Sequence, residues 1–244
     1  MDNRVMLTGI VLSSMPVGEY DKRITVLTKE QGRISAFVRG ARRPKSPLLA
    51  AGNPLSFGTF EAYRGRDSYT ISKCDIENYF DTIRTDVEAV WLATYFLEVC
   101  DFYGQEGMDE TERLKLLYTA LRALEKKQMP PELVRVVFDL KTMAINGDEP
   151  NVFECLDCGE TEDIGYFSMN KRGCVCAKHF KEEGGEALKE SVLFTMQFII
   201  SSAPEKLFSF TLGETAFIQL RDIVLRYRRR YMDHVFKSER FLEN

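Results

Sequence analysis

Two pairs of residues with metal-ligand chemistry lie in the second half of the sequence. Cys155 and Cys158 are separated by two residues and followed by Gly159, and Cys176 and His179 repeat that spacing after seventeen intervening residues. Each pair places two ligands on one tight turn, and two such turns can close a tetrahedron around an ion. Thiolate and imidazole donors both suit zinc. The spacing therefore predicts a Zn²⁺ site at Cys155, Cys158, Cys176 and His179.

A further cysteine, Cys174, leaves the ligand set open, because it could replace Cys176 or His179, although only those two keep the two-residue gap. Two other interpretations compete with zinc: buried thiols in a poorly ordered insert, and a redox Cys-x-x-Cys site. The second lacks a thioredoxin-like surrounding pattern. Four protein ligands leave no position for a substrate, so we expect a structural metal that folds the polar segment 151–183.

A second feature with chemistry is a basic cluster near the N-terminus. Residues 1–80 hold 12 of the 33 basic and 8 of the 37 acidic residues, a net charge of +4, so the remainder carries −8. Between Glu30 and Glu61 lie five basic residues and no acidic one: Arg33, Arg39, Arg42, Arg43 and Lys45. A local basic field can bind phosphate although the whole chain is acidic. The alternative interpretation is a solvated surface loop.

Patterns typical of enzymes are missing from the sequence. It contains neither a Gly-x-x-x-x-Gly-Lys-Ser/Thr phosphate loop nor a Gly-x-Ser-x-Gly nucleophile turn. Only two histidines are present, His179 in the predicted metal site and His234 near the C-terminus. The paired acidic residues fall at expected helix starts or in loops, where solvated charge is the ordinary explanation. We therefore expect a binding protein rather than an enzyme.

The elements that must position these residues change type near residue 80. Five short β-prone stretches precede it: Val5–Leu12, Ile24–Thr28, Arg33–Val38, Leu55–Tyr63 and Tyr69–Cys74. Close spacing without a helical pattern predicts a small closed barrel of the OB type, with an SH3-like barrel as the alternative. Residues 39–54 contain three prolines and Gly52, so we expect a long loop that carries the basic cluster.

From Thr85 onward the apolar period is helical. We predict helices over 87–103, 110–128, 131–146, 186–202 and 213–233. The sequence thus indicates an α+β protein with a barrel domain, 1–80, and a helical domain, 81–244, that carries a metal-binding insert at about 151–183. No apolar run approaches 18 residues and the N-terminal stretch lacks a secretory pattern, so we expect a cytoplasmic protein without a membrane span.

Several segments resemble the RecO family. They are an acidic turn, strand and Thr-x-Glu-x-Gly motif in residues 18–34, the Gly-Ala-Arg-Arg segment within 38–46, and Lys-Ser-Glu-Arg-Phe-Leu at 237–242. The Cys-x-x-Cys-Gly motif, Phe167-Ser168 and the second ligand pair also occur in family order. The chain departs from the pattern at His179, where the family often has cysteine, and at Cys174, where it often has an apolar residue.

The resemblance implies a function that composition does not show. RecO proteins bind single- and double-stranded DNA and anneal complementary strands. They engage the C-terminal tail of single-stranded-DNA-binding protein (SSB) and, with RecR, help load RecA during recombination and repair of DNA damage. It therefore implies a non-enzymatic mediator in the cytoplasm, associated with the nucleoid, with zinc in a structural role.

For this chain we expect phosphate contacts from six residues: Arg33, Arg39, Arg42, Arg43, Lys45 and Arg66. Five aromatic residues either stack on bases or fill the barrel, and the core interpretation is favoured for each: Phe37, Phe57, Phe60, Tyr63 and Tyr69. The arginines at 226–230 are either a second DNA contact or a solvated helix face. Competing functions are an OB-fold and zinc-ribbon RNA-binding module, a metal-dependent nuclease, and an adaptor for an acidic partner.

Overall fold

The computed structural model of the chain describes residues 3–183, 185–232 and 234–242. The chain packs as two compact units, Met1–Lys126 together with Phe236–Asn244, and Lys127–Val235. No helix in the described part of the chain is long and apolar enough to cross a membrane. The domains predicted from the sequence, residues 1–80 and 81–244, are segments expected to fold independently, and this division stays a prediction.

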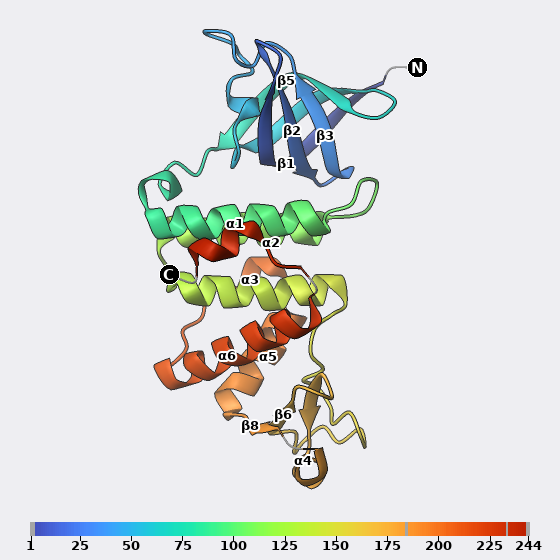
Figure 1. The fold of residues 1–244 in the computed structure, drawn as a ribbon, viewed down its shortest axis with the longest axis vertical. Coiled ribbons are helices and arrows are strands. Elements are labelled where there is room, and N and C mark those ends of the chain that lie inside the picture. Colours follow the sequence, from blue (N-terminus) through green and yellow to red (C-terminus); the bar gives the residue numbers. More distant parts are fainter. Residues whose placement is uncertain (1–2, 184, 233, 243–244) are drawn as a thin grey trace. The chain divides into compact units, whose positions relative to one another are not determined.

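The first unit begins with a closed five-stranded barrel, as predicted (Figure 1). Its strands are β1 (Arg4–Val17), β2 (Asp21–Thr28), β3 (Gly32–Val38), β4 (Phe57–Arg64) and β5 (Tyr69–Asn78). They follow the order β1-β2-β3-β5-β4, and β4 pairs back to β1. Only the β3–β5 pair is parallel among these neighbours. This topology is that of an OB-type barrel.

Alternation along the strands fills the barrel. Because successive side chains point to opposite faces, every second residue of each strand reaches the interior. The interior is closed by apolar side chains: Leu7, Val11, Ile24, Val26, Ile34, Ala36, Val38, Phe60, Ala62, Tyr69 and Ile71. The register between β1 and β2 shifts between Val11 and Ser13, and such an extra residue bends a strand. The bend lets the long β1 pair with β4 at one end and with β2 at the other.

The long connection between β3 and β4 is irregular, as predicted, but it is well fastened. It contains a short 3-10 helix, η1 (Ala50–Gly52). The ammonium of Lys22 donates to the carbonyl oxygen of Gly52 (2.8 Å) and to Oδ1 of Asn53 (3.1 Å). Ala41 and Ala51 are fully buried in the barrel core. The connection therefore covers one end of the barrel while its polar residues face outward.

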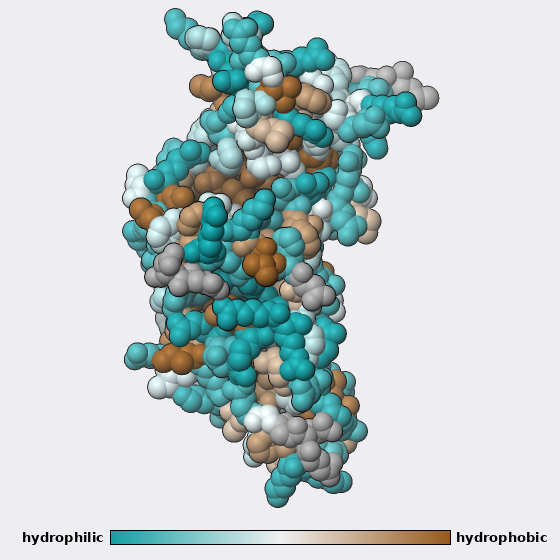
Figure 2. All heavy atoms as spheres, viewed as in Figure 1, coloured by the Kyte–Doolittle hydropathy of each residue, from teal (hydrophilic) through white to brown (hydrophobic). Residues whose placement is uncertain are grey.

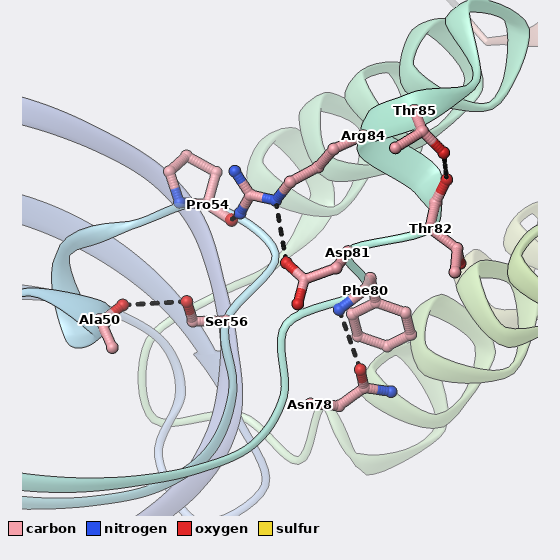
Figure 3. Close-up of polar contacts among 9 residues, drawn as sticks. All are labelled: Ala50, Pro54, Ser56, Asn78, Phe80, Asp81, Thr82, Arg84 and Thr85. Atoms are coloured by element: carbon pink, nitrogen blue, oxygen red, sulfur yellow. Dashed lines mark hydrogen bonds and ion pairs between the residues drawn. The ribbon is translucent and has the colours of Figure 1, made fainter.

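A folded linker leads from the barrel to a helical hairpin (Figure 3). The linker includes η2 (Ile83–Thr85), and the hairpin consists of α1 (Val87–Tyr103) and α2 (Thr111–Lys126). The Arg84 guanidinium donates to the carbonyl oxygen of Pro54 (3.1 Å) and lies 3.8 Å from the carboxylate of Asp81. Phe80 is fully buried, and its ring packs edge-on against Tyr118 of α2. These contacts join the barrel and hairpin in one unit.

The C-terminal segment returns to the same unit. Its 3-10 helix η4 (Lys237–Phe241) packs on α1, where the red segment crosses the green helix in Figure 1. Phe236 is buried, with its ring 5.8 Å from Tyr95 and 5.7 Å from Phe102, measured between centroids. No helix was expected from the sequence over these residues.

The second unit consists of three packed helices and the cysteine-bearing insert. The helices are α3 (Pro131–Asn146), α5 (Glu190–Ser201) and α6 (Glu214–Tyr231), each within a few residues of its prediction. The insert contains β6 (Tyr166–Ser168), β7 (Gly173–Val175), α4 (Ala177–Glu183) and β8 (Glu186–Ala187), in the sheet order β7-β6-β8, and η3 (Pro204–Lys206) follows α5. The strands of the insert have only two or three residues, too few for an alternating pattern in the sequence to identify them.

Candidate nucleic-acid interface and metal centre

The predicted basic loop is held in place by the turn between β1 and β2. The backbone N–H of Gly40 donates to the Asp21 carboxylate (2.7 Å), and the backbone N–H of Arg42 donates to the carbonyl oxygen of Tyr20 (2.9 Å). The Arg42 guanidinium also reaches the carbonyl oxygen of Gly18 (3.3 Å). The anchors are therefore chiefly backbone groups and one aspartate. The side chains of Arg39, Arg42, Arg43 and Lys45 are exposed.

An aromatic residue that the sequence analysis did not select belongs to this loop site. The guanidinium carbon of Arg43 lies 5.1 Å from the ring centroid of Tyr20, whose exposed fraction is 41%. A guanidinium over an aromatic face is favourable, and it orients the ring. The sequence feature that could have identified Tyr20 as part of this site was its position in the polar turn directly before Asp21.

The other two predicted phosphate contacts lie elsewhere on the barrel. Arg33 on β3 is half-buried, and its Nε donates to the Asp101 carboxylate of α1 at 2.5 Å. Arg66 is exposed in the β4–β5 turn, which leaves the barrel on the opposite side from the 39–49 loop in Figure 1. The structure thus brings together four of the six predicted residues. It pairs Arg33 with a carboxylate that the sequence did not link to it.

A groove crosses the outer face of β1, β2 and β3, with a volume of about 330 Å³. Strand register aligns two rows across it: Ser13, Thr25 and Ser35 in one, and Met15, Arg23 and Phe37 in the other. Arg23 Nε donates to Ser35 Oγ (2.9 Å), and its guanidinium carbon lies 5.8 Å from the Phe37 ring centroid. The groove therefore offers hydroxyls and the cations Arg23 and Arg33, and the half-buried ring of Phe37 borders it. We call it the barrel groove.

The remaining aromatic candidates have different surroundings. Phe60 and Tyr69 are buried in the barrel core, and Phe57 packs on Tyr118 with ring centroids 4.6 Å apart. Tyr63 is exposed on β4, away from the barrel groove. Of the five aromatic residues considered from the sequence, Phe37 is the one whose ring lies beside a cation that lines the groove.

The Thr-x-Glu-x-Gly motif, residues 28–32, stabilises the turn between β2 and β3. Thr28 Oγ1 donates to the carbonyl oxygen of Gly32 (2.8 Å), and the Glu30 carboxylate accepts from the backbone N–H of Thr8 (2.8 Å). Gly32 has φ +64°, and a Cβ there would lie 2.1 Å from the carbonyl oxygen of Gln105. The glycine is therefore required both by its left-handed backbone and by the close approach of the α1–α2 loop.

The predicted metal ligands converge in the second unit. One ligand atom each from Cys155, Cys158, Cys176 and His179 lies within 4.8 Å of all the others. His179 Nδ1 is 3.6 Å from Cys155 Sγ and 3.4 Å from Cys176 Sγ, and the sulfurs of Cys158 and Cys176 are 3.9 Å apart. The four atoms form a cluster that could hold a metal ion.

Short local turns position these ligands. The backbone N–H of Gly159 donates to the carbonyl oxygen of Cys155 (2.8 Å), and Gly159 has φ +74°, so the first pair sits on a glycine-closed turn. Cys176 directly follows β7 and His179 lies in the first turn of α4. Two neighbouring turns therefore supply two ligands each, which is the arrangement the spacing predicted.

The environment of the cluster favours thiolates at Cys155 and Cys176. Burial alone would raise the pKa of Cys155, but backbone N–H groups of Cys176, Asp157 and Cys158, together with the His179 side chain, lower that pKa to about 6. The backbone N–H of His179, with a smaller contribution from that of Lys178, lowers the pKa of Cys176 against the effect of burial. Neighbouring thiolates raise the pKa of His179, with Cys155 contributing most. Cys158 differs: the backbone N–H of Glu160 lowers its pKa, but burial and the side chains of Cys155 and Cys176 together raise it. Two of the three sulfurs are thus suited to bind a cation as thiolates.

Cys174, named as a substitute ligand, is not among the four converging residues. It lies on β7 opposite Phe167 and is fully buried. Burial raises the pKa of the Cys174 thiol to about 12, so it stays protonated at neutral pH.

The arginines near the end of α6 have protein partners. Arg228 is buried, with its Nε 3.7 Å from the Asp139 carboxylate. Arg226 pairs with Glu186 and Asp222, and Arg230 donates to the Asn170 side chain (2.9 Å). The solvated-face interpretation therefore does not describe Arg228.

Similarity to known proteins extends over nearly the whole chain. A family model described as "Recombination protein O N terminal" matches residues 1–80, and one described as "Recombination protein O C terminal" matches residues 84–240. A DNA repair protein RecO from Acetivibrio thermocellus is 30% identical over 243 residues, 99% of this chain and 97% of that protein. Those from Alkaliphilus metalliredigens and Bacillus mycoides are 33% identical over 169 residues (69% of each chain) and 25% over 240 (96% and 95%).

Proposed function

This chain belongs to the RecO family of DNA repair proteins, and from that premise we propose that it is a non-enzymatic mediator that binds single-stranded DNA on its barrel and anneals complementary strands. A role in DNA repair follows from the family itself. The strand path, the annealing activity and the partners described next are our proposal.

The observation that carries the proposal is the anchored basic loop. Arg39, Arg42, Arg43 and Lys45 are exposed, while backbone hydrogen bonds and Asp21 hold the segment against the β1–β2 turn. Cations on a fixed segment lose less conformational entropy on binding than cations on a free one. Figure 2 shows hydrophilic side chains gathered over this end of the barrel. The loop is suited to grip a phosphate backbone.

The barrel groove supplies the surface next to this grip. A base can stack on Phe37 beside Arg23, with Met15 completing the row, while the hydroxyls of Ser13 and Thr25 meet sugar or phosphate oxygens. Stacking on an aromatic ring is tolerant of sequence because every base has a π-face. The groove therefore suits a single strand without sequence preference, as the outer face of OB barrels does.

Annealing requires no covalent chemistry. Two complementary strands repel each other through their phosphates, and each phosphate that a Lys or Arg neutralises releases counterions. A protein that grips backbones through four exposed cations lowers this repulsion and leaves most base edges free to pair. The same physics predicts that annealing depends strongly on salt.

The metal cluster fits a structural Zn²⁺ ion. Three thiol sulfurs and one imidazole nitrogen are a donor set that zinc prefers, and the pKa of Cys155 is already lowered to about 6. Cys155, Cys158, Cys176 and His179 would hold the ion. When bound, it would supply cross-linking of two turns, which stabilises a small insert whose strands are too short to make a core.

The partners are carried over from the family as part of this proposal. We expect binding to double-stranded as well as single-stranded DNA, contact with the SSB C-terminal tail, and assembly with RecR that helps load RecA. We also expect the protein in the cytoplasm, associated with the nucleoid through DNA.

The test is strand annealing. Two complementary labelled oligonucleotides, each coated with SSB, are mixed with and without this protein at low and high salt, in the absence of ATP. We expect rapid pairing that salt suppresses. No acceleration by a folded protein would overturn the proposal, and a preference for RNA in competition would favour an RNA-binding function instead.

A further inference from the structure

We propose that the single strand continues beyond the barrel groove into a cleft bounded by β1, α1 and η4, where Lys237, Arg240 and Phe241 bind it. This inference rests on the proposed function and deepens it, because it assigns a DNA contact to the C-terminal end of the chain. All the residues involved belong to the first unit. We call this second space the C-terminal cleft.

The C-terminal cleft adjoins the barrel groove and shares two wall residues with it. Its volume is about 490 Å³, and its walls include Ser13 and Ser14 of β1, which also line the barrel groove. The opposite walls come from Leu97 of α1 and from η4. In Figure 1 the red η4 lies on the same side as the β1–β2–β3 face, and Figure 2 shows apolar side chains in the junction between the barrel and α1. A chain leaving the groove at Ser13 therefore enters the cleft directly.

The acidic side chains in this cleft already have cationic or N–H partners. The Glu98 carboxylate accepts the backbone N–H groups of Lys237 and Ser238, and the Asp101 carboxylate accepts from Arg33. Lys237 and Arg240 line the cleft, and both residues are exposed. Lys237 and Arg240 therefore stand against Glu98 and Asp101 in the cleft, and Arg33 of the adjoining barrel groove neutralises Asp101. A phosphate there meets attraction rather than repulsion.

The cleft also repeats an arrangement found twice on the barrel. The guanidinium carbon of Arg240 lies 4.8 Å from the ring centroid of Phe241, as Arg43 lies over Tyr20 and Arg23 over Phe37. The Phe241 ring is 37% exposed and stacks on Trp91, with centroids 6.3 Å apart and planes at 17°. An arginine beside a supported, accessible ring is a platform for an unpaired base.

The three platforms follow one another along β1. The register pairs Val17 with Asp21 next to Tyr20, then Met15 with Arg23, then Ser13 with Thr25, and Ser13 opens into the C-terminal cleft. The order is therefore loop, groove, cleft along a single strand of the barrel. A ligand that uses all three must be extended and must expose its bases, which describes single-stranded rather than double-stranded DNA.

The experiment measures binding of oligothymidylates from about 4 to about 16 nucleotides, the range that OB barrels span. For the intact protein, affinity should keep rising towards the longer oligonucleotides. The K237A/R240A variant should bind the shortest ones normally, lose about tenfold affinity for the longest, and show a salt slope smaller by about 1.4 on them, about 0.7 for each lost phosphate contact. F241A should lose about tenfold on long single strands and nothing on duplex DNA.

A matched control replaces two exposed lysines of the same unit that lie outside the path, as K73A/K126A. The side chains of Lys237, Arg240 and Phe241 are exposed, and the bonds to Glu98 use the Lys237 backbone, so the variants keep these bonds. Wild-type affinity of folded K237A/R240A and F241A for long oligonucleotides would overturn the inference. If instead the intact protein binds no single strand, or R42E/R43E binds every length normally, the proposed function itself fails.

Discussion

Glu98 on α1 caps the start of η4 through Ser238. Its carboxylate accepts the Ser238 backbone N–H (2.9 Å) and hydroxyl (2.5 Å), and it also accepts the backbone N–H of Lys237 (3.1 Å). Two segments separated by 140 residues along the chain, α1 and η4, are thereby joined within one unit. The Lys-Ser-Glu-Arg-Phe-Leu motif therefore has a structural role, because it attaches η4 to α1.

We expect E98A to lower the free energy of unfolding of the first unit by about 1.5 to 3 kcal/mol, since a charged acceptor of three hydrogen bonds is lost. S238A removes only the hydroxyl bond and should cost about 1 kcal/mol. Denaturant unfolding followed by Trp91 fluorescence checks both, because Trp91 stacks on Phe241 of the same segment. Equal stability of E98A and the unmodified protein would contradict the capping role.

Charge reversal in the basic loop should abolish DNA binding and leave the fold intact. Arg42 and Arg43 are exposed, and the loop is anchored mainly by backbone groups that R42E/R43E retains. Fluorescence anisotropy with labelled single strands measures the loss, and circular dichroism verifies folding. The control is charge reversal at Lys73 and Lys126, which carries the same change in net charge. Normal binding by folded R42E/R43E would exclude the loop as the contact.

Replacing Gly32 by alanine should destabilise the protein by about 2 to 4 kcal/mol. The substitution places a Cβ 2.1 Å from the carbonyl oxygen of Gln105 and adds the cost of a left-handed backbone. Gly107 is a matched control: its φ is +76°, but no atom lies within 4 Å of its Cβ position, so G107A should cost only about 1 kcal/mol. Thermal unfolding of the two variants separates the cost of the left-handed backbone from the cost of the steric clash. Equal losses of stability in G32A and G107A would show that the close approach to Gln105 is unimportant.

Metal analysis should find one zinc ion per chain, bound through the four converging residues. C155S and C158S each remove a ligand and should lose the metal, whereas C174S should retain it because Cys174 is not in the cluster. A strong chelator should unfold the insert and leave the barrel signal unchanged, since structural zinc sites fold small segments. Retention of full zinc by C155S, or its loss from C174S, would require a different ligand set.

A carboxylate in the barrel should give a defined pH dependence. Hydrogen bonding from the Arg4 side chain, against a smaller raising effect of burial, holds the pKa of Glu61 below its usual 4.5, and Ser72 adds to the lowering. A lowered pKa in the folded state stabilises the protein above the unfolded-state pKa, and the gain is lost as pH falls through the folded value. E61Q should therefore be less stable than the unmodified protein at pH 7.

The difference in stability between E61Q and the unmodified protein should shrink as pH falls below the unfolded-state pKa of Glu61 and through its lowered folded-state pKa. Thermal melting of both proteins over this range is the measurement. Arg4 is the partner to exchange in the matching variant, R4A, which should show the same narrowing of the difference. A constant difference at all pH values would mean that the Glu61 charge contributes nothing.

The sequence determined the parts of this protein that depend on local pattern. Closely spaced β-prone stretches predicted the five strands of the barrel, although β1, β2 and β5 are longer than expected. The helical period predicted α1 with the bounds that the structure has, Val87–Tyr103. Pro131 and Gly147 marked the two ends of α3, because proline suits a first helical turn and glycine a left-handed C-cap. The four converging cysteine and histidine residues were predicted from their spacing, because a tight turn brings two residues together whatever surrounds it.

Only the tertiary structure decided which distant residues meet. Arg33 resembles its basic neighbours in sequence, yet Asp101, 68 positions away, pairs with it. Phe60 and Phe37 are both aromatic residues on strands, but one fills the core and the other borders a groove beside Arg23. The return of η4 to α1 likewise depends on Glu98. Local patterns are short-range constraints, whereas these pairings arise from packing between segments far apart along the chain, which no single stretch of sequence encodes.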